Sequence, residues 1–271
     1  MNRRNNGKRP SAPKKDSIKF LVFFDIDGTL LDDDQLDLVK LRKSISVWKK
    51  FGLVFGLNTN RPWSESAKLY EQLSFNGPII AENGSYYKLN KTQPQIVSTG
   101  IDHKLPQEVL KRLGEFSDRK KNSQIIVSDD KRILLDKKIV DLLFITASRQ
   151  YSSSVYVRRY GNINRRQTRI IFEMLRKKLS TYKVELLPRF GKIIIGNKKV
   201  NKFSTLDRLR KKFFNKYKVL MIGDDETAIR RYPAIEMIAV KQASSQYKKN
   251  SDYVAKRGGV EGIKEIINNY L

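Results

Sequence analysis

The sequence predicts an α/β protein in which a Rossmann-like parallel sheet is interrupted by an inserted α+β domain. Short apolar runs alternate with amphipathic stretches in the first third of the chain and again after residue 200. Parallel strands that are buried on both faces have such continuous apolar sequences. Between these two regions the pattern changes to shorter strands interleaved with helices, which indicates a separate folding unit.

The first third of the chain predicts alternating strands and helices. The apolar run at residues 18–24 precedes an acidic turn that contains a glycine, as expected for a buried strand. Helical spacing of apolar residues from Leu36 to Phe51 and a stop at Gly52 predict the helix that follows. The next elements we expect are a strand at 53–57, a helix at 63–73 and a strand at 79–81.

The remainder of the chain predicts the inserted unit and the end of the parallel sheet. In the inserted unit we expect strands at 124–127 and 154–157, and helices at 106–116 and 166–179. The α/β alternation then returns with a helix at 202–214, strands at 219–222 and 235–240, and a helix from residue 260. We therefore predict a core domain of residues 18–85 and 189–271, an inserted domain of residues 86–188, and a disordered basic arm at 1–17.

Composition excludes several kinds of chemistry. The chain has no cysteine, so it has no disulfide, no Cys-ligated zinc and no thiol nucleophile, and its one histidine, His103, is expected in a surface loop. No apolar run is long enough for a membrane helix, which leads us to expect a cytoplasmic protein. The net charge of +27 predicts attraction to anions. A solvated Lys-rich surface and weak binding to nucleic acid or an anionic surface are both consistent with it.

The strongest chemical signal is the sequence Asp25-Ile26-Asp27-Gly28-Thr29 directly after the first strand. Ligands of open α/β sheets bind at the carboxyl ends of strands, so both carboxylates are expected at a site. Two carboxylates this close repel each other, and a hard divalent ion such as Mg²⁺ relieves that repulsion. Gly28 would give a phosphate close access to backbone amides.

Three further signals follow in chain order. Asn58-Thr59-Asn60-Arg61 comes after the second strand, where the Thr59 hydroxyl would donate to a phosphoryl oxygen. Lys202 begins a helix, where its ammonium would neutralise charge between carboxylates and phosphate. Gly223-Asp224-Asp225 supplies another carboxylate at the end of a strand.

In this order the four signals resemble the four motifs of the haloacid dehalogenase (HAD) superfamily. Ala81-Glu82-Asn83-Gly84-Ser85 and Lys202-Phe203-Ser204-Thr205-Leu206 are also similar to the members with a type IIB cap, the Cof-like and sugar-phosphate phosphatase group. The resemblance covers residues 18–271 and implies a HAD core with a type C2B cap.

The resemblance implies a role for each matching residue. Asp25 would be the nucleophile that forms an aspartyl-phosphate, and Asp27 the acid and then the base. Thr59 and Lys202 would bind the phosphoryl group, and Mg²⁺ would be held by Asp25, Asp224 and the backbone carbonyl of Asp27. The substrate-binding residues that we expect are Gly28, Asn60, Arg61, Asn83, Arg158 and Arg165. The last two belong to a basic cluster in the cap that suits a second acidic group on the substrate.

Two positions depart from the family pattern. Ala228 stands where a further acidic residue is usual, and Gln242-Ala243 stands where an Asn-Ala pair is common. The expected function is Mg²⁺-dependent hydrolysis of a small phosphomonoester, a sugar phosphate or a phosphorylated acid. The alternatives are a phosphomutase of the same family and a catalytically degenerate member that binds anions or RNA.

Deletion of residues 1–17 is expected to leave hydrolytic turnover intact and to weaken any salt-sensitive binding of nucleic acid, because this segment carries a charge of +5. Steady-state kinetics and filter binding at two salt concentrations measure the two effects. A large loss of turnover would instead place the segment in the active site.

Overall fold

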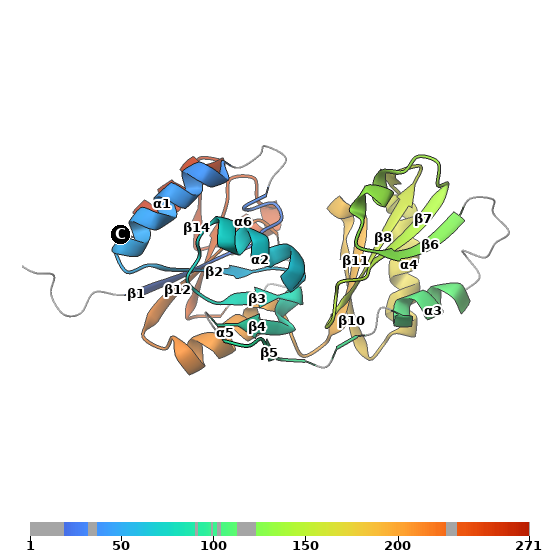
Figure 1. Cartoon of the computed structure of the whole chain (residues 1–271), viewed down its shortest axis with the longest axis horizontal. Helices are drawn as coiled ribbons and strands as arrows, with labels where there is room; N and C mark the ends of the chain where they lie inside the picture. The colour runs from blue at the N-terminus through green and yellow to red at the C-terminus, as the bar shows by residue number, and fades with distance from the viewer. Residues whose placement is uncertain are drawn as a thin grey trace, which may run out of the picture.

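The computed structural model describes residues 19–31, 37–89, 92–98, 100–101, 104–112, 123–225 and 232–270. It contains two sheets in two domains that lie side by side (Figure 1). The basic arm, His103 and Ala228 lie outside the described residues. None of the helices in the described part of the chain is both long and apolar enough to cross a membrane.

The larger sheet has the strand order β14-β13-β12-β1-β2-β3-β4-β5. Its first six strands in this order pair in parallel, and β4 and β5 add an antiparallel edge. The strands are β1 (Lys19–Phe24), β2 (Val54–Asn58), β3 (Ile79–Ala81), β4 (Tyr86–Lys88), β5 (Gln95–Ile96), β12 (Tyr217–Gly223), β13 (Ile235–Ala239) and β14 (Tyr253–Val254). The predicted parallel α/β core is confirmed, with β1 at its centre.

Five helices pack on this sheet and complete the core. They are α1 (Leu38–Lys50), α2 (Trp63–Gln72), α5 (Lys202–Phe213), α6 (Ser245–Asn250) and α7 (Gly259–Asn268). The apolar spacing that predicts α1 buries Leu41, Ile45 and Trp48 against the strands. The 3-10 turn Glu82–Gly84 links β3 to β4.

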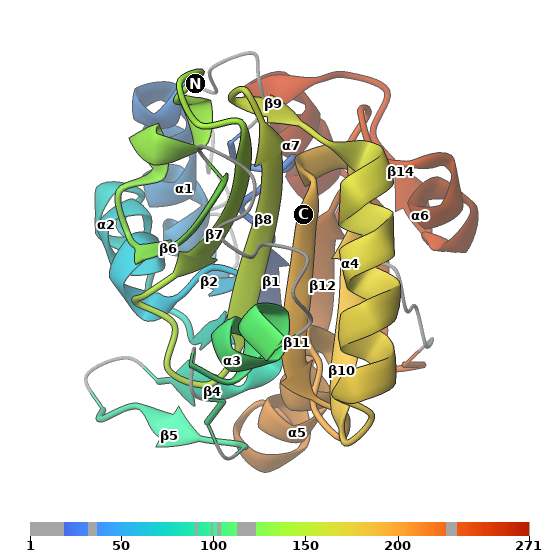
Figure 2. The ribbon, with the colours of Figure 1, turned by 90° about the vertical axis from the view of Figure 1, so that its right-hand side faces the viewer.

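The second sheet has the strand order β10-β11-β8-β7-β6, with β9 paired to β8. Its strands are β6 (Ser123–Ser128), β7 (Asp141–Thr146), β8 (Ser153–Arg159), β9 (Asn162–Ile163), β10 (Tyr182–Leu187) and β11 (Lys192–Asn197). The helices α3 (Lys104–Arg112) and α4 (Arg165–Lys178) pack on the face turned away from the larger domain, as Figure 2 shows. The opposite face is turned toward the larger domain. Leu134 and Ile139 cover part of it by packing on Leu142, Phe144 and Tyr156, and the part formed by β10 and β11 is open to a cavity.

The two sheets divide the chain at different residues from those predicted. Although the inserted domain was expected to begin at residue 86, β4 and β5 extend the larger sheet because the turn after β3 folds β4 back onto it. At the other end, β11 was expected in the core domain. It instead pairs antiparallel with β10 and β8, since Gly191, at φ +52, lets the chain turn back after β10.

Most of the predicted elements are present, with ends shifted by a few residues. Several elements are not predicted by the local sequence pattern. Among them are the strands β7 and β10 of the second domain, and the strand β14 and helix α6 of the larger domain. The predicted end of α3 near residue 116 lies outside the described residues.

Replacement of Leu41 by alanine is expected to lower the free energy of unfolding by about 2–5 kcal/mol, because its side chain is fully buried beneath α1. Val39 on the same helix is 66% exposed, so Val39→Ala should change the free energy by no more than about 0.5 kcal/mol. Urea unfolding of both variants measures the difference. Equal effects would contradict the assignment of the buried face.

Candidate active site

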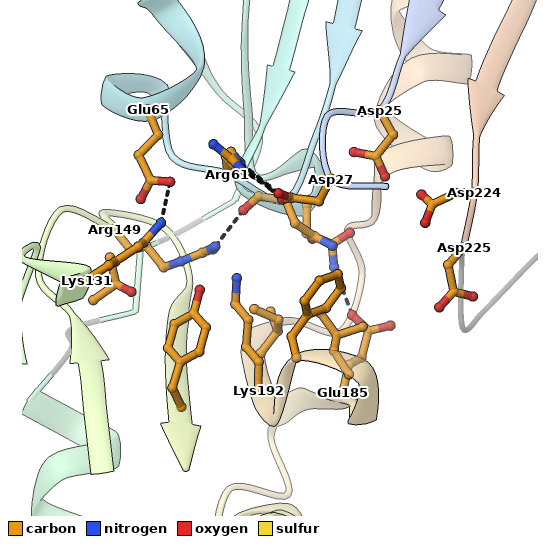
Figure 3. A pocket seen from close by; sticks show the side chains of 17 residues that line it. Asp25, Asp27, Arg61, Glu65, Lys131, Arg149, Glu185, Lys192, Asp224 and Asp225 are labelled. Atoms are coloured by element: carbon orange, nitrogen blue, oxygen red, sulfur yellow. Dashed lines mark hydrogen bonds and ion pairs between the residues drawn. The ribbon is translucent and has the colours of Figure 1, made fainter. Parts of the chain in front are cut away.

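The carboxyl ends of three adjacent parallel strands bring the predicted site residues together. Asp25 and Asp27 follow β1, Thr59 follows β2, and Asp224 follows β12. Because β1 pairs with both β2 and β12, these loops meet at one edge of the sheet (Figure 3). This is where ligands bind in open α/β sheets.

Lys202 lies against Asp25 at the first position of α5. The helix start is held by a capping box in which Asn201 and Ser204 exchange hydrogen bonds. The ammonium of Lys202, whose side chain is 1% exposed, donates to Asp25 Oδ2 at 2.6 Å. Burial raises the pKa of Asp25, and the contact with Lys202 opposes that shift. Lys202 thus supplies a fixed positive charge beside the carboxylate.

Asp224 is a second buried carboxylate near Asp25. Thr29 Oγ1 donates to Asp224 Oδ1 at 3.2 Å. Burial and the negative charge of Asp25 raise the pKa of Asp224 to about 7. Gly28 packs directly against this carboxylate: a Cβ at residue 28, where φ is +76°, would lie 2.0 Å from Asp224 Oδ2. Only glycine fits between the two loops.

The donor set at this edge fits a hard divalent cation. The negative charge of Asp25 raises the pKa of the buried Asp224 carboxyl, so an added positive charge would stabilise the two carboxylates, and Mg²⁺ prefers oxygen ligands. Within the described part of the chain, no three acidic, histidine or cysteine side chains are placed so that together they could hold a metal ion. A metal here would therefore need a backbone carbonyl or water as a further ligand, and the Asp27 carbonyl is the expected one.

Asp27 is held by Arg61. The guanidinium donates from Nε to both carboxylate oxygens at 3.1 Å and from Nη2 to Oδ1 at 2.5 Å. Burial of Asp27 acts to raise its pKa, but the hydrogen bonds and charge of Arg61 outweigh burial, and the pKa is lowered. Arg61, expected to bind substrate, therefore contacts the predicted acid in this structure.

The other residues after β2 differ in their access to the site. Thr59 is fully buried, and its Oγ1 accepts the backbone N–H of Arg61 at 3.1 Å. Asn60 lines the cavity, and its Oδ1 is buried without a hydrogen-bond partner in the described part of the chain. On the opposite side of the site, Gln242 donates to the Gly28 carbonyl at 3.0 Å and so supports the Asp25–Thr29 loop.

A cavity of about 240 Å³ lies between this sheet edge and the open face of the second sheet. The larger domain contributes Asp25, Asp27, Asn60, Arg61, Glu65, Asn83, Asp224 and Asp225, and the second domain contributes Lys131, Thr146, Arg149, Tyr156, Glu185, Leu187, Phe190, Lys192 and Ile194. Asn83, which we expect to bind substrate, lines the cavity and donates to Glu185 at 2.9 Å.

The structure does not bring Arg158 and Arg165 to this cavity. Both line a separate hollow of the second domain, near Leu135 and Tyr160. The Arg158 guanidinium is used within its own domain, where it donates to the carbonyls of Val157, Phe190 and Gly191. The expectation that these two arginines bind substrate in the active site is therefore not supported by the geometry.

The basic residues of the second domain that do line the cavity are ones that the sequence pattern does not predict. Lys131, Arg149 and Lys192 all line the cavity from the second domain. Lys and Arg are too abundant in the chain for any of the three to be recognised by type. Lys192 has one local signal, because it is the first residue of a strand and three isoleucines follow it.

Glu82 joins the two domains. Its carboxylate, 1% exposed, accepts the backbone N–H groups of Gln150, Tyr151 and Ser152 at 3.0, 2.9 and 2.8 Å, and the Ser152 hydroxyl at 2.9 Å. The adjacent Arg149 donates to the Asn60 carbonyl and to Ser152 Oγ, both at 2.7 Å. These contacts fix the loop at 149–152 against the larger domain.

Comparison with known proteins agrees with this architecture. A family model described as haloacid dehalogenase-like hydrolase matches residues 22–267. A 5-amino-6-(5-phospho-D-ribitylamino)uracil phosphatase of Bacillus subtilis, YitU, is 33% identical over 100 residues, which is 36% of this chain and 36% of that protein. The match thus spans about a third of the length of this curated relative.

Two solved structures superpose over nearly the whole chain. A haloacid dehalogenase-like hydrolase from Bacteroides thetaiotaomicron has a TM-score of 0.67 at 16% identity, covering 93% of this chain and 99% of that one. A HAD subclass IIB sugar phosphatase has a TM-score of 0.61 at 17% identity, covering 93% and 98%. At these identities the similarity establishes the fold, which is the expected core with a subclass II cap.

Glu82→Gln is expected to lower the free energy of unfolding by about 1–3 kcal/mol, because an amide NH₂ would face a backbone donor that the carboxylate now satisfies. The matched control is Glu71→Gln, at an exposed position of α2. Urea unfolding measures the change, and hydrogen exchange of the amides at 150–152 localises it. Unaltered exchange at these amides would argue against the contact.

Proposed function

The chain belongs to the haloacid dehalogenase-like hydrolase family, and from that premise we propose that it is a phosphatase of small phosphomonoesters with Asp25 as its nucleophile. The observation that carries the proposal is the buried Asp25 carboxylate, 2.6 Å from the Lys202 ammonium and at the edge of a cavity between two domains. The phosphatase and sugar phosphatase among its relatives support a small phosphorylated substrate.

In the first step, an Asp25 oxygen attacks phosphorus and the bond from phosphorus to the ester oxygen breaks. Asp27 protonates the departing oxygen, which leaves an aspartyl-phosphate on Asp25 and a free alcohol. Lys202 and the Thr59 hydroxyl stabilise the negative charge on the phosphoryl oxygens. The Thr59 oxygen accepts the Arg61 N–H and so keeps its own hydrogen for donation.

In the second step, Asp27 removes a proton from water, and the resulting hydroxide attacks the phosphorus. Phosphate leaves and the Asp25 carboxylate is restored. Arg61 lowers the pKa of Asp27 and thus favours the ionised form that this step needs. For the first step Asp27 must carry a proton, so we propose that a phosphoryl group draws Arg61 away from it.

Asp25, Asp224 and the Asp27 carbonyl would hold Mg²⁺, which would supply positive charge to neutralise the phosphoryl oxygens when bound. Since Asp224 and Asp25 repel each other in its absence, we expect the metal to bind only when both are ionised.

Asp25→Asn is expected to reduce hydrolysis of p-nitrophenyl phosphate by at least about 1000-fold, because an amide is not a nucleophile. Chelation with EDTA should abolish the activity of the unaltered protein, and added Mg²⁺ should restore it. Asp136→Asn, at an exposed position of the second domain, is the control and should retain full activity.

Two results would contradict the proposal: full activity in Asp25→Asn, or activity that is indifferent to EDTA. Product analysis by phosphorus NMR separates the phosphatase from the phosphomutase alternative. A phosphatase releases inorganic phosphate, whereas a mutase returns the phosphoryl group to another position of the substrate.

A further inference from the structure

Two buried cations in the cavity, Lys192 and Arg149, have no carboxylate partner among the residues that the structure describes. Their side chains are 8% and 4% exposed. The Lys192 ammonium makes no hydrogen bond or ion pair with any described residue, and it lies over the Tyr156 ring, 5.0 Å from the ring centre. Arg149 donates only to neutral oxygens, those of Asn60 and Ser152, and its Nε is buried without an acceptor among the described residues.

The strand periodicity of β11 aims Lys192 into the cavity. Ile193 and Ile195 pack in the apolar layer beneath α3 and α4, so the alternate positions, Lys192 and Ile194, face the other way. Lys192 is paired in register with Tyr156 of β8, which also lines the cavity. Figure 3 shows the Lys192 side chain extending toward the side of the cavity where Arg149 and Asp27 lie.

The other charges around these two cations are already matched. Lys131 is 2.6 Å from Glu65, Arg61 holds Asp27, and Glu185 is contacted by Lys183 and Asn83. None of these carboxylates is left over for Lys192 or Arg149. A buried ammonium without a counterion is costly. Burial, together with the charges of Arg149 and Lys131, lowers the pKa of Lys192 despite the opposing effect of Asp27.

The cavity is therefore electrically divided. Toward the larger domain, Asp25 and Asp224 form the carboxylate end, where a phosphoryl group and its metal are proposed to bind. Toward the second domain, Lys192 and Arg149 form a cationic end that a phosphoryl group at Asp25 would leave unmatched. A substrate with one charged group would complete only one of these ends.

We propose that Lys192 and Arg149 form a subsite for a second anionic group, a carboxylate or another phosphate, on the alcohol part of the substrate. This inference rests on the proposed phosphatase function and narrows its substrate class. The cavity volume of about 240 Å³ is below the roughly 300 Å³ at which pockets for drug-sized ligands begin, which favours a short molecule. The preferred substrates are thus short phosphomonoesters with a second anionic group, rather than sugar phosphates whose alcohol part is uncharged.

The test compares pairs of substrates that share a carbon chain and differ in whether a second anionic group is present. The first pair is phosphoglycolate and ethylene glycol monophosphate, in which a hydroxymethyl group replaces the carboxylate. The second pair is propanediol bisphosphate and propanediol monophosphate, which separates phosphate from carboxylate recognition. In each pair we call the compound with the second anionic group the charged member and the compound without it the neutral member. In at least one pair we expect kcat/KM of the charged member to exceed that of the neutral member by roughly 10- to 150-fold, the equivalent of one hydrogen bond to a charged group.

Lys192→Met removes the charge and keeps the length of the side chain. It is expected to lower this charged-to-neutral ratio by at least about 10-fold, chiefly through KM, and Lys192→Arg should restore part of the ratio. Lys198→Met, at an exposed position beyond the far end of β11, is the control and should leave the ratio unchanged. Circular dichroism verifies that each variant is folded.

A ratio near one for both pairs in the unaltered protein would overturn the inference, whether or not Lys192→Met folds. So would a high ratio that survives Lys192→Met. Hydrolysis of the neutral members and of p-nitrophenyl phosphate separates this failure from failure of the proposed function: if they are hydrolysed with no preference for charge, the phosphatase proposal stands and only the subsite is lost.

Discussion

The buried ion pair between Lys202 and Asp25 is the constraint around which the site is organised. It joins residues 177 positions apart, and both side chains are almost completely withdrawn from water. Such a pair is stable only if its geometry is held and its neighbours provide further polar contacts. The central position of β1 in the sheet and the capping box at the start of α5 provide that geometry. The remaining loops of the site then have little freedom: Gly28 must lack a side chain because Asp224 occupies the adjoining space.

The second domain completes the site through the open face of its sheet. One face is covered by α3 and α4, so every second residue of β8, β10 and β11 is directed at the larger domain. This alternation brings Tyr156, Glu185 and Lys192 to the cavity while their neighbours form an apolar core. Glu82 then fixes the distance between the domains, because its carboxylate satisfies three successive backbone donors of the loop that carries Arg149. The position of one buried cation of the cavity is thus coupled to the contact between the domains.

The charges in the cavity are divided between the two domains. Carboxylates that repel each other lie at the end of the parallel sheet, and unmatched cations lie on the second domain. The pair of Arg61 and Asp27 stands between them and is matched internally. A molecule with a phosphoryl group at one end and another anion at the other complements this arrangement.

The sequence by itself determined the α/β class, the order of most elements and the chemistry at the sheet edge, because apolar runs and the polar residues directly after them are local features. The sequence pattern singles out Asp25, Asp27, Asp224 and Lys202 by their places after a strand or at a helix start. The order in which they occur along the chain resembles the family's motifs and indicates the same residues. Only the tertiary structure decided which of the many lysines and arginines face the cavity, since this depends on strand register and on which sheet face is covered. For that reason Arg158 and Arg165, which belong to one basic stretch of the sequence, lie away from the cavity. Lys192 and Arg149, which are far apart in sequence, line it together. The division between the domains was decided in the same way, by backbone pairing of β4 and β11 that no local pattern records.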